Sequence, residues 1–131
     1  MNITKQLPLA SVIAVTLGWS SLAAAGCTPP QVSGVWEAAF SSGNSCRIKL
    51  KSNGAVDPGK SVCFDPDRGS AGLDSGTLKV AGDCFAEGEI VLGGQVIELA
   101  VQFSHDRAMA AGRIRVPGDG SKASVVMVRV P

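Results

Sequence analysis

The sequence predicts an all-β protein, a small up-and-down meander of about eight antiparallel strands that rolls into a closed or nearly closed barrel. Two observations support this fold class. Apolar and polar residues alternate with a period of two in several short runs, and Gly, Pro, Asn and Asp interrupt the chain at a spacing of roughly 8–12 residues. No run after Pro30 has a helical pattern. We expect closure into a barrel because it removes the exposed edges of an open meander.

The first 25 residues have the pattern of a secretory signal peptide. Lys5 supplies the positive charge, residues 7–22 are mostly apolar, and Ala23–Ala25 forms a small-residue cleavage site. A retained membrane anchor fits less well because Pro8 and several polar residues interrupt the apolar run. The full chain has 12 Lys+Arg and 11 Asp+Glu, so loss of Lys5 brings the net charge to zero. This neutrality argues against a nucleic-acid-binding protein.

After this segment we expect an extended leader at 26–31, followed by one β-barrel domain at 32–131. The Pro29–Pro30 pair favours extended backbone in the leader. In Cys46–Lys51 the Cys, Ile and Leu side chains share one face and three basic side chains share the other, as in a half-buried strand. The expected strands are Val32–Phe40, Cys46–Lys51, Ala55–Cys63 with an interruption at Asp57–Gly59, Gly76–Val80, Ala86–Leu92, Gln95–Phe103, Ala108–Val116 and Lys122–Val130.

The four cysteines predict structural disulfides in an oxidising compartment. The chain has no Cys-x-x-Cys motif, and the cysteine spacings fit neither a zinc site nor a redox site. The sequence leaves three pairings open. Cys63 with Cys84 would close an irregular loop between them, whereas Cys27 with Cys46 would tie the leader to the second expected strand. Each disulfide typically contributes about 2–4 kcal/mol to stability.

No residue pattern in the chain predicts catalysis, so we expect a protein that is not an enzyme and has no cofactor. His105, the single histidine, lies between two expected strands, which indicates a turn. Glu87 and Glu89 share a strand face, and we interpret that face as a solvated outer surface rather than a glycosidase pair. Calcium could use the carboxylates of one loop, but the loop lacks the order of a calcium-binding motif and a solvated turn is favoured. These carboxylates are Asp65, Asp67 and Asp74.

Three residues are expected to close one end of the barrel. Gly34 and Trp36 lie at the start of the first strand, where Gly allows close approach and Trp fills the barrel end. Arg129 lies on the last strand, which pairs with the first if the barrel closes, so its guanidinium can stack on the indole. The alternative role of Trp36 is contact with a ligand.

These residues also carry a family resemblance. A Gly-x-Trp near the start of the first strand and an Arg on the last are similar to the signature of calycin-type barrels, which include lipocalins and avidins. Together with the run Cys46–Leu50 and with Cys63, they resemble the small bacterial periplasmic inhibitors of secreted metalloproteases and the related outer-membrane lipoproteins. The resemblance implies a disulfide between Cys46 and Cys63 and an N-terminal trunk that enters the protease cleft. It makes the leader a candidate partner contact, at Thr28, Pro29, Pro30 and Gln31.

We therefore expect a periplasmic or secreted, non-catalytic β-barrel that binds a protein partner and inhibits a protease or another hydrolase. Two alternatives remain open. The sequence Ala24-Ala25-Gly26-Cys27 resembles a lipobox, so the protein could be an outer-membrane lipoprotein tethered through Cys27 with a structural role. It could also be a lipocalin-like carrier, although the low aromatic content favours a filled barrel. A carrier would need a cavity among Ile48, Leu50, Leu78, Ile90, Leu99, Val101 and Phe103.

Overall fold

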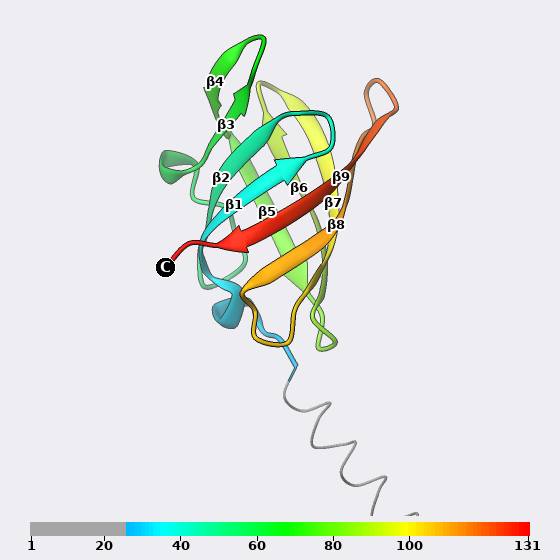
Figure 1. The fold of residues 1–131 in the computed structure, drawn as a ribbon. Coiled ribbons are helices and arrows are strands. Elements are labelled where there is room, and N and C mark those ends of the chain that lie inside the picture. Colours follow the sequence, from blue (N-terminus) through cyan, green and yellow to red (C-terminus); the bar gives the residue numbers. More distant parts are fainter. Residues whose placement is uncertain (1–25) are drawn as a thin grey trace, which may run out of the picture.

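The computed structural model describes residues 26–131, which form nine antiparallel strands in one strongly curled sheet (Figure 1). The all-β meander is confirmed, while the expected signal peptide at 1–25 lies outside the described residues. The order across the sheet is β4-β3-β2-β1-β9-β8-β7-β6-β5. The strands are β1 (Gly34–Phe40), β2 (Ser45–Leu50), β3 (Val62–Asp65), β4 (Gly69–Gly72), β5 (Ser75–Val80), β6 (Phe85–Leu92), β7 (Gln95–Phe103), β8 (Met109–Val116) and β9 (Ser121–Arg129).

The sheet is open rather than closed, which corrects the expected barrel of about eight strands. The first and last strands do pair, with Trp36 opposite Arg129, but β4 and β5 form the two ends of the sheet. Only residues 73 and 74 separate β4 from β5, and at this corner the chain leaves β3 and joins β6. A short segment partly spans the opening, because Val56 bridges to Leu50 and Ala55 bridges to Thr77.

The region between β2 and β5 differs most from the expected strands. The predicted strand Ala55–Cys63 contains a 3₁₀ helix, η2 (Pro58–Lys60), because the Asp57 carboxylate accepts a hydrogen bond from the Gly59 amide and turns the chain. The segment expected to be an irregular loop instead forms the hairpin of β3 and β4. Its turn places Gly69 at φ +85°, a conformation that suits glycine.

The leader is also not extended. Residues Pro29–Val32 form a 3₁₀ helix, η1, since the fixed φ of Pro29 suits the first position of a helix. The Gln31 amide donates to the Thr28 carbonyl at 3.0 Å, and the Gln31 side chain accepts a hydrogen bond from the Thr28 amide at 3.0 Å. Val32 is fully buried and belongs to the core.

Side chains fill the interior of the curled sheet. The most deeply buried large side chains are Trp36, Ile48, Met127, Val32, Val101 and Val125. The cavity among Ile48, Leu50, Leu78, Ile90 and Leu99 has a volume of about 10 Å³, enough for about one water molecule. A carrier function would need far more space there, so the structure does not provide the cavity that the carrier alternative requires.

The two disulfides are Cys27–Cys84 and Cys46–Cys63. The second is the pairing that the family resemblance implies, and it joins residues that lie opposite each other in β2 and β3. The alternatives Cys63–Cys84 and Cys27–Cys46 are wrong. A sulfur atom in a disulfide cannot also carry a lipid, so the Cys27–Cys84 bond is incompatible with tethering through Cys27. Among residues 26–131 no helix is long and apolar enough to cross a membrane.

Candidate functional site

Trp36 closes one end of the curled sheet from inside. Its side chain is fully buried, and its indole nitrogen donates to the Val32 carbonyl at 2.9 Å. The expected contact with Arg129 is present, with the guanidinium carbon 5.1 Å from the ring centroid, and Phe103 packs edge-on at 5.2 Å. A fully buried indole offers no surface to a ligand in solvent. Gly34 differs from its expected role, because it adopts φ +124° and no atom approaches the place of a Cβ.

The leader is held against the body of the protein at several points. The Cys27–Cys84 disulfide fixes one end, and the Arg129 guanidinium donates to the Gln31 carbonyl at 2.6 Å. Thr28, Pro30 and Gln31 are exposed and Pro29 is half-buried, so the structure brings these four predicted contacts together on one short turn. This turn cannot extend as a trunk while both anchors hold.

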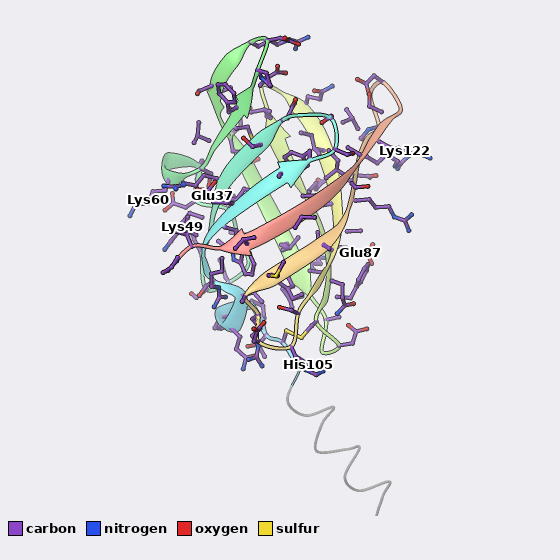
Figure 2. The ribbon with its side chains drawn as sticks, in the orientation of Figure 1. Glu37, Lys49, Lys60, Glu87, His105 and Lys122 are labelled. Atoms are coloured by element: carbon purple, nitrogen blue, oxygen red, sulfur yellow. A yellow bond between two sulfur atoms is a disulfide. The ribbon has the colours of Figure 1, made fainter. Side chains whose placement is uncertain are left out.

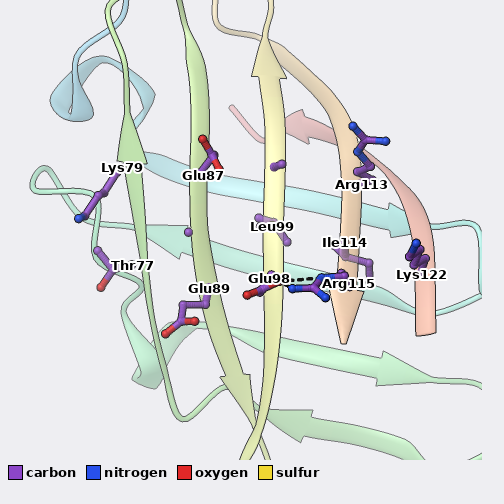
Figure 3. A pocket seen from close by; sticks show the side chains of 12 residues that line it. Thr77, Lys79, Glu87, Glu89, Glu98, Leu99, Arg113, Ile114, Arg115 and Lys122 are labelled. Carbon is purple, nitrogen blue, oxygen red and sulfur yellow. Dashed lines mark hydrogen bonds and ion pairs between the residues drawn. The ribbon is translucent and has the colours of Figure 1, made fainter. Parts of the chain in front are cut away.

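A hollow of about 880 Å³ lies on the outer face of β5–β9 (Figure 3), and we call it the charged hollow. The residues that line it come from five neighbouring strands, and its charged side chains lie at outward-facing positions of these strands. Leu99 and Ile114 also line it, although Leu99 belongs to the core and Ile114 packs against it. Strand pairing arranges most of the lining residues in two rows across the sheet. One row is Thr77, Glu89, Glu98, Arg115 and Lys122, and the other is Lys79, Glu87, Ala100 and Arg113.

The two halves of the charged hollow have opposite charge. The acidic half is on β6 and β7, at Glu87, Glu89 and Glu98, and the basic half is on β8 and β9, at Arg113, Arg115 and Lys122. Lys79 on β5 adds one positive charge beside the acidic half, directly opposite Glu87. One ion pair joins the halves, between Arg115 and Glu98 at 2.6 Å. Both partners are about half exposed, and such surface pairs contribute at most about 1 kcal/mol.

Like charges face each other within each half. Glu89 lies directly opposite Glu98, and Arg115 lies directly opposite Lys122. Like charges at directly opposed positions destabilise a sheet. These two contacts are unfavourable taken singly, while the Arg115–Glu98 ion pair between them is favourable.

An exposed apolar surface continues from the basic half along β8 and β9. Met109, Val126 and Val128 are 50%, 47% and 47% exposed and lie on the outer face of these adjacent strands. We call these three residues the apolar band. Contiguous exposed apolar side chains beside polar groups often mark protein interaction sites.

The remaining sequence candidates are not gathered into a site. His105 lies in the turn between β7 and β8, as expected. Hydrogen bonds from the Ser104 hydroxyl and the Ala108 amide hold the pKa of Asp106 in that turn below its usual value.

Two of the three loop carboxylates accept hydrogen bonds from backbone amides. Asp65 accepts a hydrogen bond from the Asp67 amide at 2.8 Å, and Asp74 accepts one from the Gly94 amide at 3.1 Å. The first contact is a turn contact within the loop, and the second joins the loop to the turn between β6 and β7. Residues 26–131 contain no group of three or more His, Cys, Asp or Glu side chains that could hold a metal ion.

Sequence reasoning missed the charged hollow, although it placed Glu87 and Glu89 correctly on an outer face. The missing step was the register of the strands. Two outward positions of β6 are acidic and two of β8 are basic, and only alignment of the hairpins shows that they lie across one surface. No protein-family model matches the chain, and a search of curated proteins finds no significant match. The family resemblance therefore stays a prediction.

Proposed function

We propose that this protein is an exported, non-catalytic protein-binding domain that inhibits a secreted hydrolase through the charged hollow and the apolar band. The observation that carries the proposal is the placement of like charges opposite each other in the hollow, at Glu89–Glu98 and Arg115–Lys122. A partner with complementary charges would relieve both repulsions on binding. The same surface would then favour the complex while slightly destabilising the free protein.

The outer face suits a protein partner better than other ligands. The interior has room for about one water molecule, so a small ligand has no enclosed site in the described core. A nucleic acid would need a basic surface throughout, whereas half of the hollow is acidic. The apolar band adds apolar area to the acidic and basic halves of the hollow, and apolar side chains bordered by polar groups are typical of protein interfaces.

Two further observations support export and inhibition. Both disulfides suit an oxidising compartment, which agrees with the signal peptide expected at residues 1–25. The resemblance to metalloprotease inhibitors supports a hydrolase as partner, and the Cys46–Cys63 pairing is common to the resemblance and the structure. The fixed leader supports contact through the sheet rather than insertion of a trunk.

The test is inhibition of a panel of secreted metalloproteases, serine proteases and lysozymes by the oxidised protein at micromolar concentration. Lys122→Glu reverses a charge in the hollow, and Lys60→Glu is the matched control. Both lysines are exposed, and Figure 2 shows them on opposite sides of the molecule. We expect Lys122→Glu to weaken inhibition about tenfold, which corresponds to about 1.4 kcal/mol, and Lys60→Glu to leave it unchanged. Absence of inhibition across the panel, or equal effects of the two variants, would overturn the proposal.

A further inference from the structure

The hairpin of β3 and β4 projects from the rest of the sheet (Figure 1), and β4 forms one end of the strand order. β4 pairs with β3 on one side only. All four of its residues, Gly69–Gly72, are exposed. The backbone of β4 therefore presents an uncovered edge.

The ladder with β3 shows which backbone groups point to this edge. The Leu73 amide donates to the Ser61 carbonyl at 3.2 Å, and residues 61 and 73 continue the register of the β3–β4 ladder. Hydrogen-bonded pairs alternate with non-bonded pairs in an antiparallel ladder, so Gly69 and Ala71 bond to β3. Ser70 and Gly72 then direct their N–H and C=O groups to the open side. Four backbone groups at a two-residue spacing are the pattern to which another strand can bond.

No side chain of β4 blocks such pairing, although with four residues it is a short edge strand. Edge strands of natural proteins commonly carry a charge or a proline that prevents another strand from adding, and the sequence Gly-Ser-Ala-Gly has neither. The other end of the sheet is different. Gly54 accepts a hydrogen bond from the Leu78 amide and the Val56 amide donates to the Gly76 carbonyl, so this segment partly covers the edge of β5.

Apolar side chains lie beside the open edge. Val62 and Phe64 on β3 are 40% and 49% exposed and lie directly opposite Gly72 and Ser70. A strand added to β4 would lie about 10 Å from β3, since neighbouring strands are about 4.8 Å apart. Because the residues of β4 are small, no large side chain lies between Phe64 and the added strand. The Cys46–Cys63 disulfide fixes β3 to β2, which lowers the entropy cost of binding at this edge.

We propose that β4 binds an extended segment of a partner protein as an additional strand. The segment bonds to the backbone of Ser70 and Gly72, and it carries apolar side chains at alternate positions that pack against Phe64 and Val62. This surface is formed by different strands from those of the charged hollow, so the inference goes beyond the proposed function and does not depend on it.

The test is amide hydrogen exchange of the oxidised protein, followed by NMR, with a blocked hexapeptide of alternating valine and threonine. A peptide of the same sequence with N-methyl groups at alternate residues, which cannot complete a strand ladder, is the matched probe. In the free protein we expect the Ser70 and Gly72 amides to exchange rapidly. At saturating hexapeptide we expect their exchange to slow at least tenfold, with no slowing by the N-methylated peptide.

Two variants sharpen the result. Phe64→Ser should weaken hexapeptide binding about tenfold, whereas Val96→Ser, a comparable change at an exposed position of β7, should leave it unchanged. Ser70→Pro removes an outward amide without removing a bond to β3 and should abolish the protection of Gly72. Three outcomes would overturn the proposal: no protection at millimolar hexapeptide, protection at β5 instead, or protection that rises with protein concentration alone, which would identify a second copy as the occupant.

Discussion

Removal of the Cys27–Cys84 disulfide should destabilise the protein more than removal of Cys46–Cys63. The two bonds span 57 and 17 residues, and a cross-link restricts the unfolded chain more when its loop is longer. The intact Cys46–Cys63 bond lies inside the longer loop and shortens it to about 40 residues, so the chain-entropy relation gives about 3.9 kcal/mol for the longer loop and about 3.1 kcal/mol for the shorter one. All four cysteines are at most 8% exposed, so the cavity that each pair of alanines leaves should be similar. The two variants should then differ in their free energy of unfolding by about 1 kcal/mol, and this difference arises from the difference in loop length.

The measurement is urea-induced unfolding of the double variants Cys27→Ala/Cys84→Ala and Cys46→Ala/Cys63→Ala under oxidising conditions. The leader keeps its other contacts in the first variant, since Val32 stays buried and Arg129 still binds the Gln31 carbonyl. Its folded state should therefore retain the native near-ultraviolet spectrum. A smaller loss for Cys27→Ala/Cys84→Ala than for the other pair would refute the loop-length reasoning.

Three more predictions follow from local geometry and are checked by separate measurements. Gly112→Ala should cost about 3 kcal/mol in urea unfolding because the added methyl group would overlap the Ala100 carbonyl, whereas Gly118→Ala, with open space, should change stability by less than about 0.5 kcal/mol. Trp36→Phe should lower the free energy of unfolding by about 1–3 kcal/mol because it leaves the buried Val32 carbonyl without its donor. An unchanged free energy of unfolding would contradict the role of Trp36 in closing the end of the sheet. The pKa of Asp106 in the folded protein, measured by NMR titration, should lie below its usual value of 3.8. Because folding lowers this pKa, the ionised carboxylate stabilises the protein above the pKa of the unfolded state. This stabilisation should disappear as the pH falls through the pKa of the folded state. A normal or raised pKa would contradict the Ser104 hydrogen bond.

Much of the fold follows from local patterns. Alternation in Cys46–Lys51 and Gln95–Phe103 predicted strands that the structure contains with nearly the same bounds, because one apolar face and one solvated face determine which side chains are buried. The pairing of the first and last strands was expected only with barrel closure, and the open sheet contains it all the same, with Arg129 over Trp36.

The errors lie where local patterns give no signal. β4 has the sequence Gly-Ser-Ala-Gly, which has no apolar alternation, and it is a strand only because β3 pairs with it. Whether the sheet closes into a barrel depends on the corner at residues 73 and 74, where the chain turns away from β3. The leader contained two prolines, and their fixed φ is compatible with both the expected extended backbone and the observed 3₁₀ helix.

The charged hollow could be recognised only in part. The acidic residues of β6 were visible as an outer face, but the like-charge pairs depend on the register between hairpins. A two-residue turn such as Gly93–Gly94 indicates a hairpin and hence the β6–β7 register, which is enough to place Glu89 opposite Glu98. The longer turns before β8 and β9 leave their registers undetermined.

The central claim is that the charged hollow keeps like charges opposed for a partner, at the expense of stability. The most direct measurement is the free energy of unfolding of Glu89→Lys, which places a positive charge opposite Glu98 without changing an inward-facing side chain. We predict an increase of about 0.2–1 kcal/mol at low ionic strength that high salt removes. A decrease in stability would contradict it, because it would show that Glu89 stabilises the free protein.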